Sequence, residues 1–120
     1  MSKILIVDDD KQVTFFLEKL LSMEGYETTS VNESSEAMEA ARSINPDLFI
    51  LDLMMPEPNG FELCRMLRAD PNFSQTPIVI ITVMDDSDSR AIAFLAGAND
   101  YLMKPFRPDE LAQRMKALLG

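Results

Sequence analysis

The chain has 120 residues, 47% of them hydrophobic and 26% charged, which predicts one ordinary globular domain over residues 1–120. Its 20 acidic residues outnumber its 11 basic ones and give a formal net charge of −9, so direct binding to DNA or to anionic membranes is not expected. Histidine is absent, which excludes a Ser-His-Asp triad, a histidine-ligated metal and a phosphohistidine on this chain.

Five short apolar runs are predicted to form strands. In chain order they are Lys3–Val7, Tyr26–Val31, Leu48–Leu51, Pro77–Thr82 and Asp100–Met103. The first, third and fourth contain the continuously apolar runs ILIV, LFIL and IVII, a pattern typical of strands buried on both faces of a parallel sheet. The second and fifth are more polar, which indicates that they lie at the edges.

A helix is predicted after each strand. The first has an apolar stripe at positions 13, 16, 17, 20 and 21 and ends at Gly25. The others are expected over about Ser34–Ile44, Asn59–Arg68, Ser87–Ala96 and Pro108–Leu119. Strict alternation of strands and helices predicts a doubly wound α/β fold, (βα)5 and flavodoxin-like. Its five-stranded parallel sheet would have the order 2-1-3-4-5, with helices on both faces.

In such a sheet, ligands bind at the carboxyl ends of the strands, where the strand order reverses. The first strand is followed by Asp8 and Asp9, and the third by Asp52. Because these strands are expected to be neighbours, the three carboxylates should converge on one cleft. Thr82 ends the fourth strand and Lys104 follows the fifth, so a hydroxyl and an ammonium should lie beside them.

Three carboxylates in one cleft repel one another, and a hard divalent cation with oxygen ligands, such as Mg2+, relieves that repulsion. A carboxylate can also act as the nucleophile toward phosphorus and form an aspartyl phosphate. Taken singly, these residues have simpler explanations. Asp10 is most simply a helix N-cap, a terminal Thr is usually structural, and a lone Lys is usually a surface charge. Their joint placement at four strand ends is what favours a phosphoryl-transfer site.

The chain resembles the receiver domain of bacterial two-component response regulators along its whole length. The resemblance is carried by ILIVDDD (4–10), PDLFILDLMMPEPNG (46–60), IVIIT (78–82) and GANDYLMKPF (97–106). It implies that Asp52 is the phosphoacceptor and that Asp9 binds Mg2+, or Mn2+ in its place, directly. Asp8 would act on the metal through water, and the backbone carbonyl of Met54 would be a further ligand.

The resemblance also implies a switch. Thr82 would be the switch hydroxyl, Tyr101 the aromatic residue that turns inward on activation, and Lys104 the ion-pair partner of the phosphoryl group. Pro105 would follow a cis peptide bond that aims Lys104 into the site. The phosphoryl group would come from a sensor histidine kinase, a phosphotransfer protein or a small donor such as acetyl phosphate. Such a domain is a signalling switch with self-directed phosphotransfer, not a turnover enzyme acting on an external substrate.

Three residues depart from the commonest family pattern. Val83 follows Thr82 where a smaller residue is usual, and Met54 and Met84 are apolar where many relatives carry polar groups. We expect the two methionines to hinder the attacking water and to slow autodephosphorylation.

In the fourth predicted helix, Phe94 is expected to anchor the core, which leaves Ala91, Ile92 and Leu95 facing outward. An isolated exposed apolar residue carries no meaning, but a patch can mark an interface. In receivers, the face made by the fourth helix, fifth strand and fifth helix often mediates dimers or partner binding. The resemblance therefore favours a homodimer or partner interface there.

Two other classes of protein share parts of this pattern. Phosphohydrolases of the haloacid-dehalogenase type also use an Asp nucleophile, but they carry a second acidic residue two positions later, where this chain has Met54, and no cap domain is expected here. Degenerate receivers that serve only as binding modules lose an acidic residue, the Thr or the Lys, all of which are present here.

The single cysteine, Cys64, excludes an internal disulfide and is expected to be a small buried apolar side chain. With no signal peptide or membrane-spanning run in the sequence, a cytoplasmic protein is expected.

Overall fold

Five parallel strands form the sheet of the computed structural model, which describes all 120 residues. They are β1 (Lys3–Val7), β2 (Glu27–Val31), β3 (Leu48–Leu51), β4 (Ile78–Thr82) and β5 (Asp100–Met103). The order is β2-β1-β3-β4-β5, so the predicted order 2-1-3-4-5 is confirmed. The two polar strands, β2 and β5, lie at the edges as predicted, and both β2 and β4 begin one residue later than the sequence suggested.

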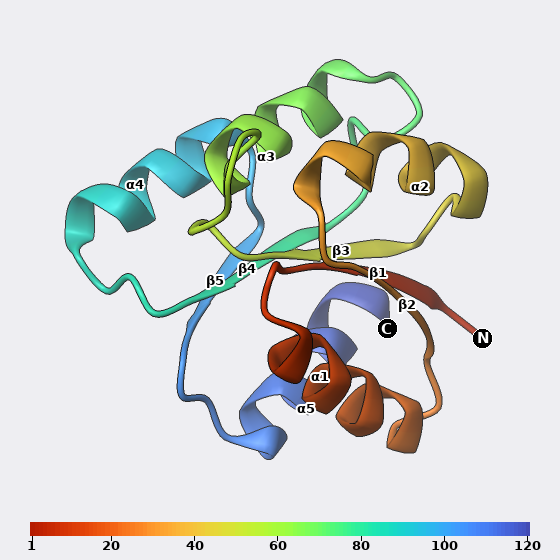
Figure 1. Cartoon of the computed structure of the whole chain (residues 1–120). Helices are drawn as coiled ribbons and strands as arrows, with labels where there is room; N and C mark the ends of the chain where they lie inside the picture. Colours follow the sequence, from red (N-terminus) through yellow and green to blue (C-terminus); the bar gives the residue numbers. More distant parts are fainter.

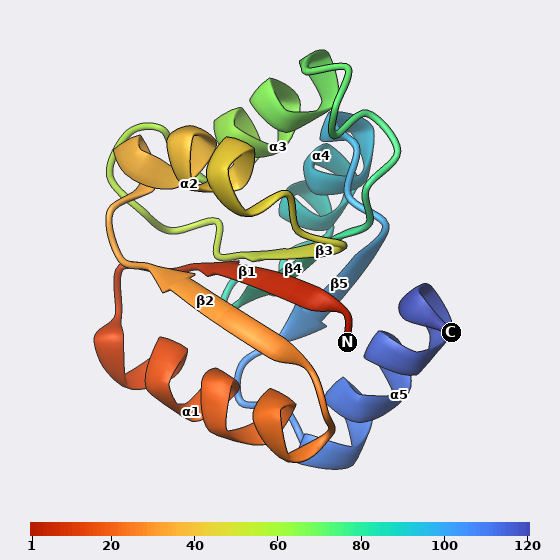
Figure 2. The same ribbon diagram turned by 90° about the vertical axis from the view of Figure 1, so that its right-hand side faces the viewer.

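Helices cover both faces of the sheet. The α-helices are α1 (Lys11–Met23), α2 (Ala37–Ile44), α3 (Gly60–Ala69), α4 (Ser87–Ala96) and α5 (Pro108–Leu119). In Figures 1 and 2, α2, α3 and α4 lie on one face, while α1 and α5 lie on the other. The second predicted helix is divided, because it opens with a 3-10 turn, η1 (Ser34–Glu36). None of the helices has the length and apolar composition that crossing a bilayer requires.

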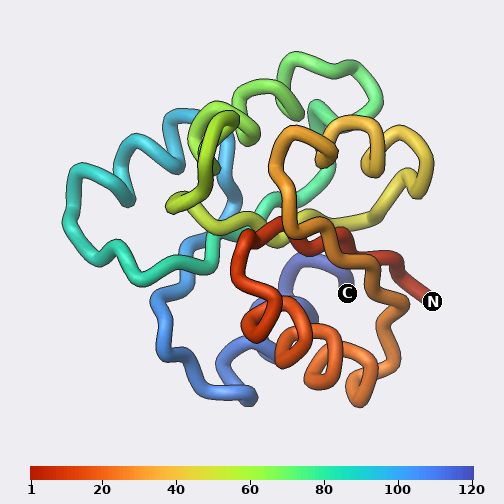
Figure 3. Tube along the Cα trace, in the orientation of Figure 1, coloured from red at the N-terminus to blue at the C-terminus, as the bar shows by residue number.

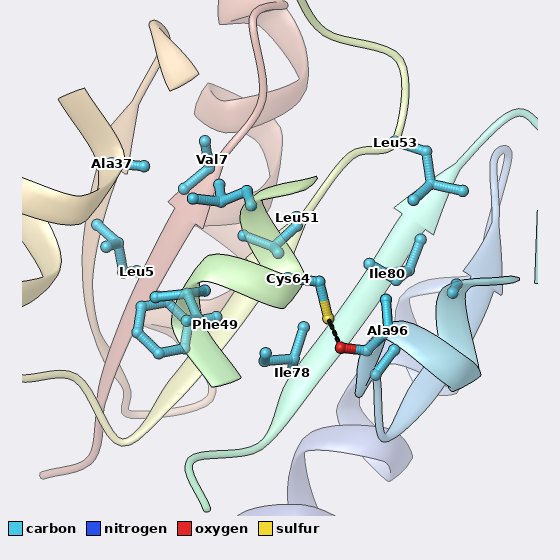
Figure 4. Close-up of a cluster of buried hydrophobic side chains, with 14 of the residues drawn as sticks. Leu5, Val7, Ala37, Phe49, Leu51, Leu53, Cys64, Ile78, Ile80 and Ala96 are labelled. Carbon is cyan, nitrogen blue, oxygen red and sulfur yellow. Dashed lines mark hydrogen bonds between the residues drawn. The ribbon is translucent and has the colours of Figure 1, made fainter. Parts of the chain in front are cut away.

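Each face of the sheet has its own hydrophobic core. The apolar side chains of β1, β3 and β4 alternate between the two faces, and all of them are buried, as the continuous apolar runs predicted. Cys64 is 1% exposed and its thiol donates a hydrogen bond to the carbonyl of Ala96, 3.4 Å away (Figure 4). The prediction of a small buried side chain at this position is confirmed.

The packing of α4 differs from the expectation that Phe94 anchors the core. Phe94 is 43% exposed, and the side chains that α4 buries are the small ones of Ser89, Ala93 and Ala96, which are 6%, 1% and 7% exposed. A helix that packs through small side chains lies close to its neighbours and leaves no room for a phenyl ring beneath it. Ile92 and Leu95 are 45% and 87% exposed, so their outward position is confirmed.

The C-terminal end of α4 is held by Arg68 of α3. Its Nε donates to the carbonyl of Gly97 at 3.0 Å, and its Nη2 donates to Oδ1 of Asn99 at 2.7 Å. Its Nη1 donates to the carbonyls of Phe73 and Thr76 at 2.8 and 2.6 Å. One guanidinium thus ties α3, the segment between α3 and β4, and the turn between α4 and β5.

The turns after β1, β3, β4 and β5 all lie at the same edge of the sheet (Figure 3). Parallel pairing places the carboxyl end of every strand at that edge. Because Val7 pairs with Leu51 at the ends of β1 and β3, the residues that follow these two strands are brought next to each other.

Candidate functional site

The three predicted acidic residues do meet at this edge. Carboxylate oxygens of Asp8, Asp9 and Asp52 all lie within 4.8 Å of one another. Asp8 and Asp52 are 3% and 7% exposed, whereas Asp9 is exposed to solvent. The cluster therefore has two buried carboxylates and one that solvent reaches directly.

Lys104 neutralises part of this negative charge. Its Nζ lies 2.8 Å from Oδ2 of Asp8 and 2.8 Å from Oδ2 of Asp52, so one ammonium bridges the carboxylates that follow β1 and β3. Burial opposes the charged form of Lys104, but the hydrogen bonds with Asp52 and Asp8 outweigh it and raise its pKa above the ordinary lysine value. The peptide bond between Lys104 and Pro105 is cis, the geometry that the family resemblance implies.

Asp8 remains an unfavourable place for a negative charge. Burial raises the pKa of Asp8 and the nearby charge of Asp52 adds to that effect, although the hydrogen bonds with Lys104 and the backbone of Asp10 act in the opposite direction. Lys104 supplies one positive charge to the two buried carboxylates, and Asp9 adds a third carboxylate at the surface, which leaves an excess of negative charge. This donor set, made only of oxygens, fits a hard divalent cation such as Mg2+.

Backbone amides fix the orientation of both buried carboxylates. The amide of Asp10 donates to Oδ1 of Asp8 at 2.9 Å, and the amide of Met54 donates to Oδ1 of Asp52 at 3.1 Å. The side chain of Asp10 does not join the cluster; it accepts from the amide of Gln12 as the N-cap of α1, as predicted.

Thr82 and Tyr101 are joined through the backbone of Met84. Thr82 is fully buried, and its Oγ1 accepts from the amide of Met84 at 3.4 Å. Tyr101 is 3% exposed, and its hydroxyl donates to the carbonyl of Met84 at 2.6 Å. No hydrogen bond joins the Thr82 hydroxyl to Asp52 or Lys104 in this structure.

Two residues that support the site were not singled out from the sequence. A Cβ on Gly60, the first residue of α3, would clash with the carbonyl oxygen of Asp52 and would lie 2.6 Å from Cα of Leu53. The side-chain amide of Asn32 donates to the carbonyl of Asp8 at 2.9 Å and to Oγ1 of Thr14 at 3.1 Å. The sequence gives no signal for Asn32, whereas Gly60 directly after the helix cap Asn59 could have suggested a close backbone approach.

A polar cavity of about 300 Å³ adjoins the exposed side of the cluster. Asp9 forms one wall, and the other walls come from the turn after β2 and the loop after β3. Ser34 and the carbonyl of Pro56, both in its lining, are joined by a hydrogen bond of 2.8 Å. The acidic cluster is thus open to solvent on the side of Asp9.

Comparison with known proteins agrees with this site. A family model described as the response regulator receiver domain matches residues 4–116. The DNA-binding response regulator MtrA of Mycolicibacterium smegmatis is 44% identical over 117 residues, which cover 98% of this chain and 50% of that protein. The chain thus spans about half the length of the curated relatives that it matches.

Two solved receiver domains share the fold. One belongs to the sensor histidine kinase PA1611 of Pseudomonas aeruginosa and has a magnesium ion coordinated in its active site cleft; it is 30% identical, with a TM-score of 0.91 and coverage of 99% of this chain and 98% of that one. The BeF3-activated N-terminal receiver domain of Klebsiella pneumoniae RstA is 32% identical, with a TM-score of 0.92 and coverage of 98% and 97%. The chain belongs to the response regulator receiver domains of two-component signalling, and Asp8, Asp9 and Asp52 form the acidic pocket for its magnesium-dependent phosphorylation.

Proposed function

We propose that Asp52 accepts the phosphoryl group and that Asp9 binds the metal directly, with Asp8 acting on it through water and the Met54 carbonyl as a further ligand. The observation that carries this assignment is the bridging of Asp52 and Asp8 by one ammonium next to the solvent-facing carboxylate of Asp9. Mg2+ bound to these oxygens supplies positive charge to the oxygens of the transferring group.

In the proposed reaction, a carboxylate oxygen of Asp52 forms a bond to phosphorus while the bond from phosphorus to the donor breaks, and the leaving group keeps its electron pair. The amide of Met54 already orients the nucleophile at 3.1 Å. Lys104 then exchanges its contact with the carboxylate for a phosphoryl oxygen, and Thr82 offers its hydroxyl to another. Positioning and positive charge are the main means of catalysis for such a transfer.

The assignment predicts that acetyl phosphate and Mg2+ add one phosphoryl group to the wild-type chain. Asp52→Asn should abolish the mass increase, and Asp9→Asn or a chelator should reduce it strongly. Asp10→Asn is the matched control, because it removes the same charge from the neighbouring position and keeps an effective N-cap. Intact-mass spectrometry measures all four proteins, and an Asp52→Asn protein that still gains the mass would refute the choice of acceptor.

The donor in signalling is a histidine kinase, as membership of the receiver family implies, and a phosphotransfer protein is a further candidate. The response ends when water attacks phosphorus, which releases phosphate and restores the carboxylate. Met54 is 54% exposed beside the nucleophile, and Met84 packs partly into the core, so neither can hold an attacking water by a side-chain hydrogen bond.

A slow hydrolysis is therefore expected, and Met84→Asn should shorten the lifetime of the phosphorylated state about tenfold, which equals roughly 1.4 kcal/mol of barrier. Met84→Leu, which keeps the apolar side chain, serves as the control. Decay of the phosphorylated protein is followed by intact mass after removal of the donor. A wild-type half-life of seconds that Met84→Asn leaves unchanged would contradict the proposed role.

We further propose that the face of α4, β5 and α5 is the output surface, as a homodimer or partner interface. Ala91, Ile92 and Leu95 are exposed on α4, and Arg114 of α5 forms an ion pair with Asp100 of β5 at the same face. Ile92→Glu combined with Leu95→Glu should abolish association that depends on phosphorylation, because it places charge in an apolar patch.

Sedimentation of the beryllofluoride-treated protein measures that association. Glu39→Gln is the control, because it changes an exposed charged residue away from this surface. Glu39 lies on α2, which follows β2, and β2 is at the opposite edge of the sheet from β5. If the double variant still associated after beryllofluoride treatment, the interface would have to lie elsewhere on the chain. In a longer protein that contains this chain, we propose that any DNA contact is made by another part, since MtrA is a DNA-binding regulator of about twice this length.

A further inference from the structure

The ring of Tyr101 is covered by two residues of α4. The guanidinium carbon of Arg90 lies 4.5 Å from the centre of the ring, which is a cation–π contact. The ring of Phe94 lies 6.5 Å from that of Tyr101, centre to centre. Arg90 and Phe94 are four residues apart, so they project from the same side of the helix and together form a cover over the tyrosine.

The aromatic ring is the only identified partner of the Arg90 guanidinium. None of the five ion pairs in the structure includes Arg90, although the chain has 20 acidic residues. Asp86 precedes it by one helical turn, but its carboxylate accepts from the amide of Ser89 as the N-cap of α4. The position of Arg90 is therefore coupled to the position of the Tyr101 ring.

The hydroxyl end of Tyr101 is connected to Thr82, one of the proposed site residues. Its hydroxyl is bonded to the carbonyl of Met84, and the amide of Met84 is bonded to Oγ1 of Thr82. A continuous series of contacts thus connects the Thr82 hydroxyl, through the backbone of Met84 and the Tyr101 ring, to the guanidinium of Arg90 on α4. If the ring left this position, it would lose the hydroxyl bond and the cation–π contact together.

We propose that Arg90 is a positioning residue that holds Tyr101 inward and thereby couples the state of Thr82 to the α4 surface. The proposal rests on the proposed function, since Thr82 has a role only if Asp52 is phosphorylated. A cation–π contact of this kind shifts an equilibrium between inward and outward ring positions by roughly two- to thirtyfold. Arg90 belongs to the same helix as Ala91, Ile92 and Leu95, so this contact ties the helix that carries the proposed output surface to the site.

Tyrosine fluorescence offers a direct test, because the chain has no tryptophan and only two tyrosines. In a Tyr26→Phe background, Tyr101 is the sole emitter, and quenching by acrylamide reports how well solvent reaches its ring. We expect weak quenching with Arg90, a several-fold higher quenching constant in both Arg90→Met and Arg90→Gln, and an intermediate value in Arg90→Lys.

Arg107→Met is the matched control, since it removes an 80% exposed arginine side chain that pairs with Asp109 and does not contact Tyr101. Quenching that is the same in Arg90→Met, Arg90→Gln and Arg107→Met would overturn the proposal. Two neutral replacements are included so that the result does not depend on the folding of one variant.

The coupling to the site is tested by adding Mg2+ and beryllofluoride, an analogue of the phosphoryl group. Weak quenching should return in Arg90→Met, and the variant should need a two- to thirtyfold higher beryllofluoride concentration than the wild type. If quenching in Arg90→Met stayed strong with Mg2+ and beryllofluoride, or if the variant needed no more beryllofluoride than the wild type, the link to Thr82 would be overturned. Failure of the wild-type chain to accept a phosphoryl group from acetyl phosphate would instead refute the proposed function. The quenching measured without beryllofluoride would still show whether Arg90 holds the Tyr101 ring inward.

Discussion

Gly60→Ala is expected to lower the free energy of unfolding by about 3 kcal/mol and to slow phosphorylation of Asp52. The new methyl group would clash with the carbonyl oxygen of Asp52 and the Cα of Leu53, and both are backbone atoms that cannot rotate away. The change should otherwise favour folding, since Gly60 begins α3 and alanine is the better helix former by about 1 kcal/mol. Any loss of stability in Gly60→Ala therefore measures the steric conflict with the backbone of Asp52 and Leu53.

Urea unfolding and the rate of mass increase with acetyl phosphate check this prediction together. Gly25→Ala is the matched control, because Gly25 has a φ of +91° with nothing within 4 Å of an added Cβ. That variant should lose only the cost of the left-handed backbone, about 1 kcal/mol, and should be phosphorylated at the wild-type rate. If Gly60→Ala were as stable and as reactive as the wild type, close packing against Asp52 would not matter to the site.

Lys104→Met is expected to lower the free energy of unfolding by about as much as Gly60→Ala, but through the loss of a charge. Without the ammonium, Asp8 and Asp52 are two buried carboxylates with no cation, and the free energy of unfolding at neutral pH should fall by about 3 kcal/mol. Phosphotransfer should slow on the order of 100-fold, since a positive charge aimed at the transferring group is lost. Added Mg2+ should restore more stability in this variant than in the wild type.

The loss of stability in Lys104→Met should depend on pH in a definite direction. In the wild type, the raised pKa of Lys104 contributes stability that is fully present below the ordinary lysine value and is lost as the pH rises through the higher value of the folded state. In Lys104→Met, lowering the pH from about 7 to about 5 should reduce this loss of stability, because burial already raises the pKa of Asp8 and the folded state then takes up a proton there. Urea unfolding at both pH values measures it, with Lys104→Arg as the charge-conserving control. A deficit that is the same at both pH values would mean that lost packing, not charge, is the cause.

The sheet could be predicted in detail because its signals are local and strong. Runs such as LFIL (48–51) are apolar at every position, which is typical of a strand covered on both faces, and alternation with helices left few topologies. The site followed from that topology, since residues directly after neighbouring parallel strands must lie close together. Asp8, Asp52 and Lys104 were located in this way, and the structure joins them by ion pairs.

Features that depend on packing between distant segments could not be predicted. Phe94 was expected in the core because burial of a large aromatic ring is favourable, but α4 buries only the small side chains of Ser89, Ala93 and Ala96. Periodicity gives the direction of a side chain and not the distance to the neighbouring element. For the same reason, the contact of Arg90 with Tyr101 and the bonds from Asn32 to Asp8 have no counterpart in any sequence motif.

The four hydrogen bonds of Arg68 determine how α4 can move. Two of them fix the carbonyl of Gly97 and the side chain of Asn99, directly after the helix, to α3, and the other two join α3 to the carbonyls of Phe73 and Thr76. The opposite end begins at Asp86 and follows Thr82 by a short loop. A helix anchored at one end cannot slide along the sheet, so a rearrangement of α4 has to be a swing about Gly97. Displacements would then grow along the helix toward Asp86, and Arg90 would travel farther than Leu95.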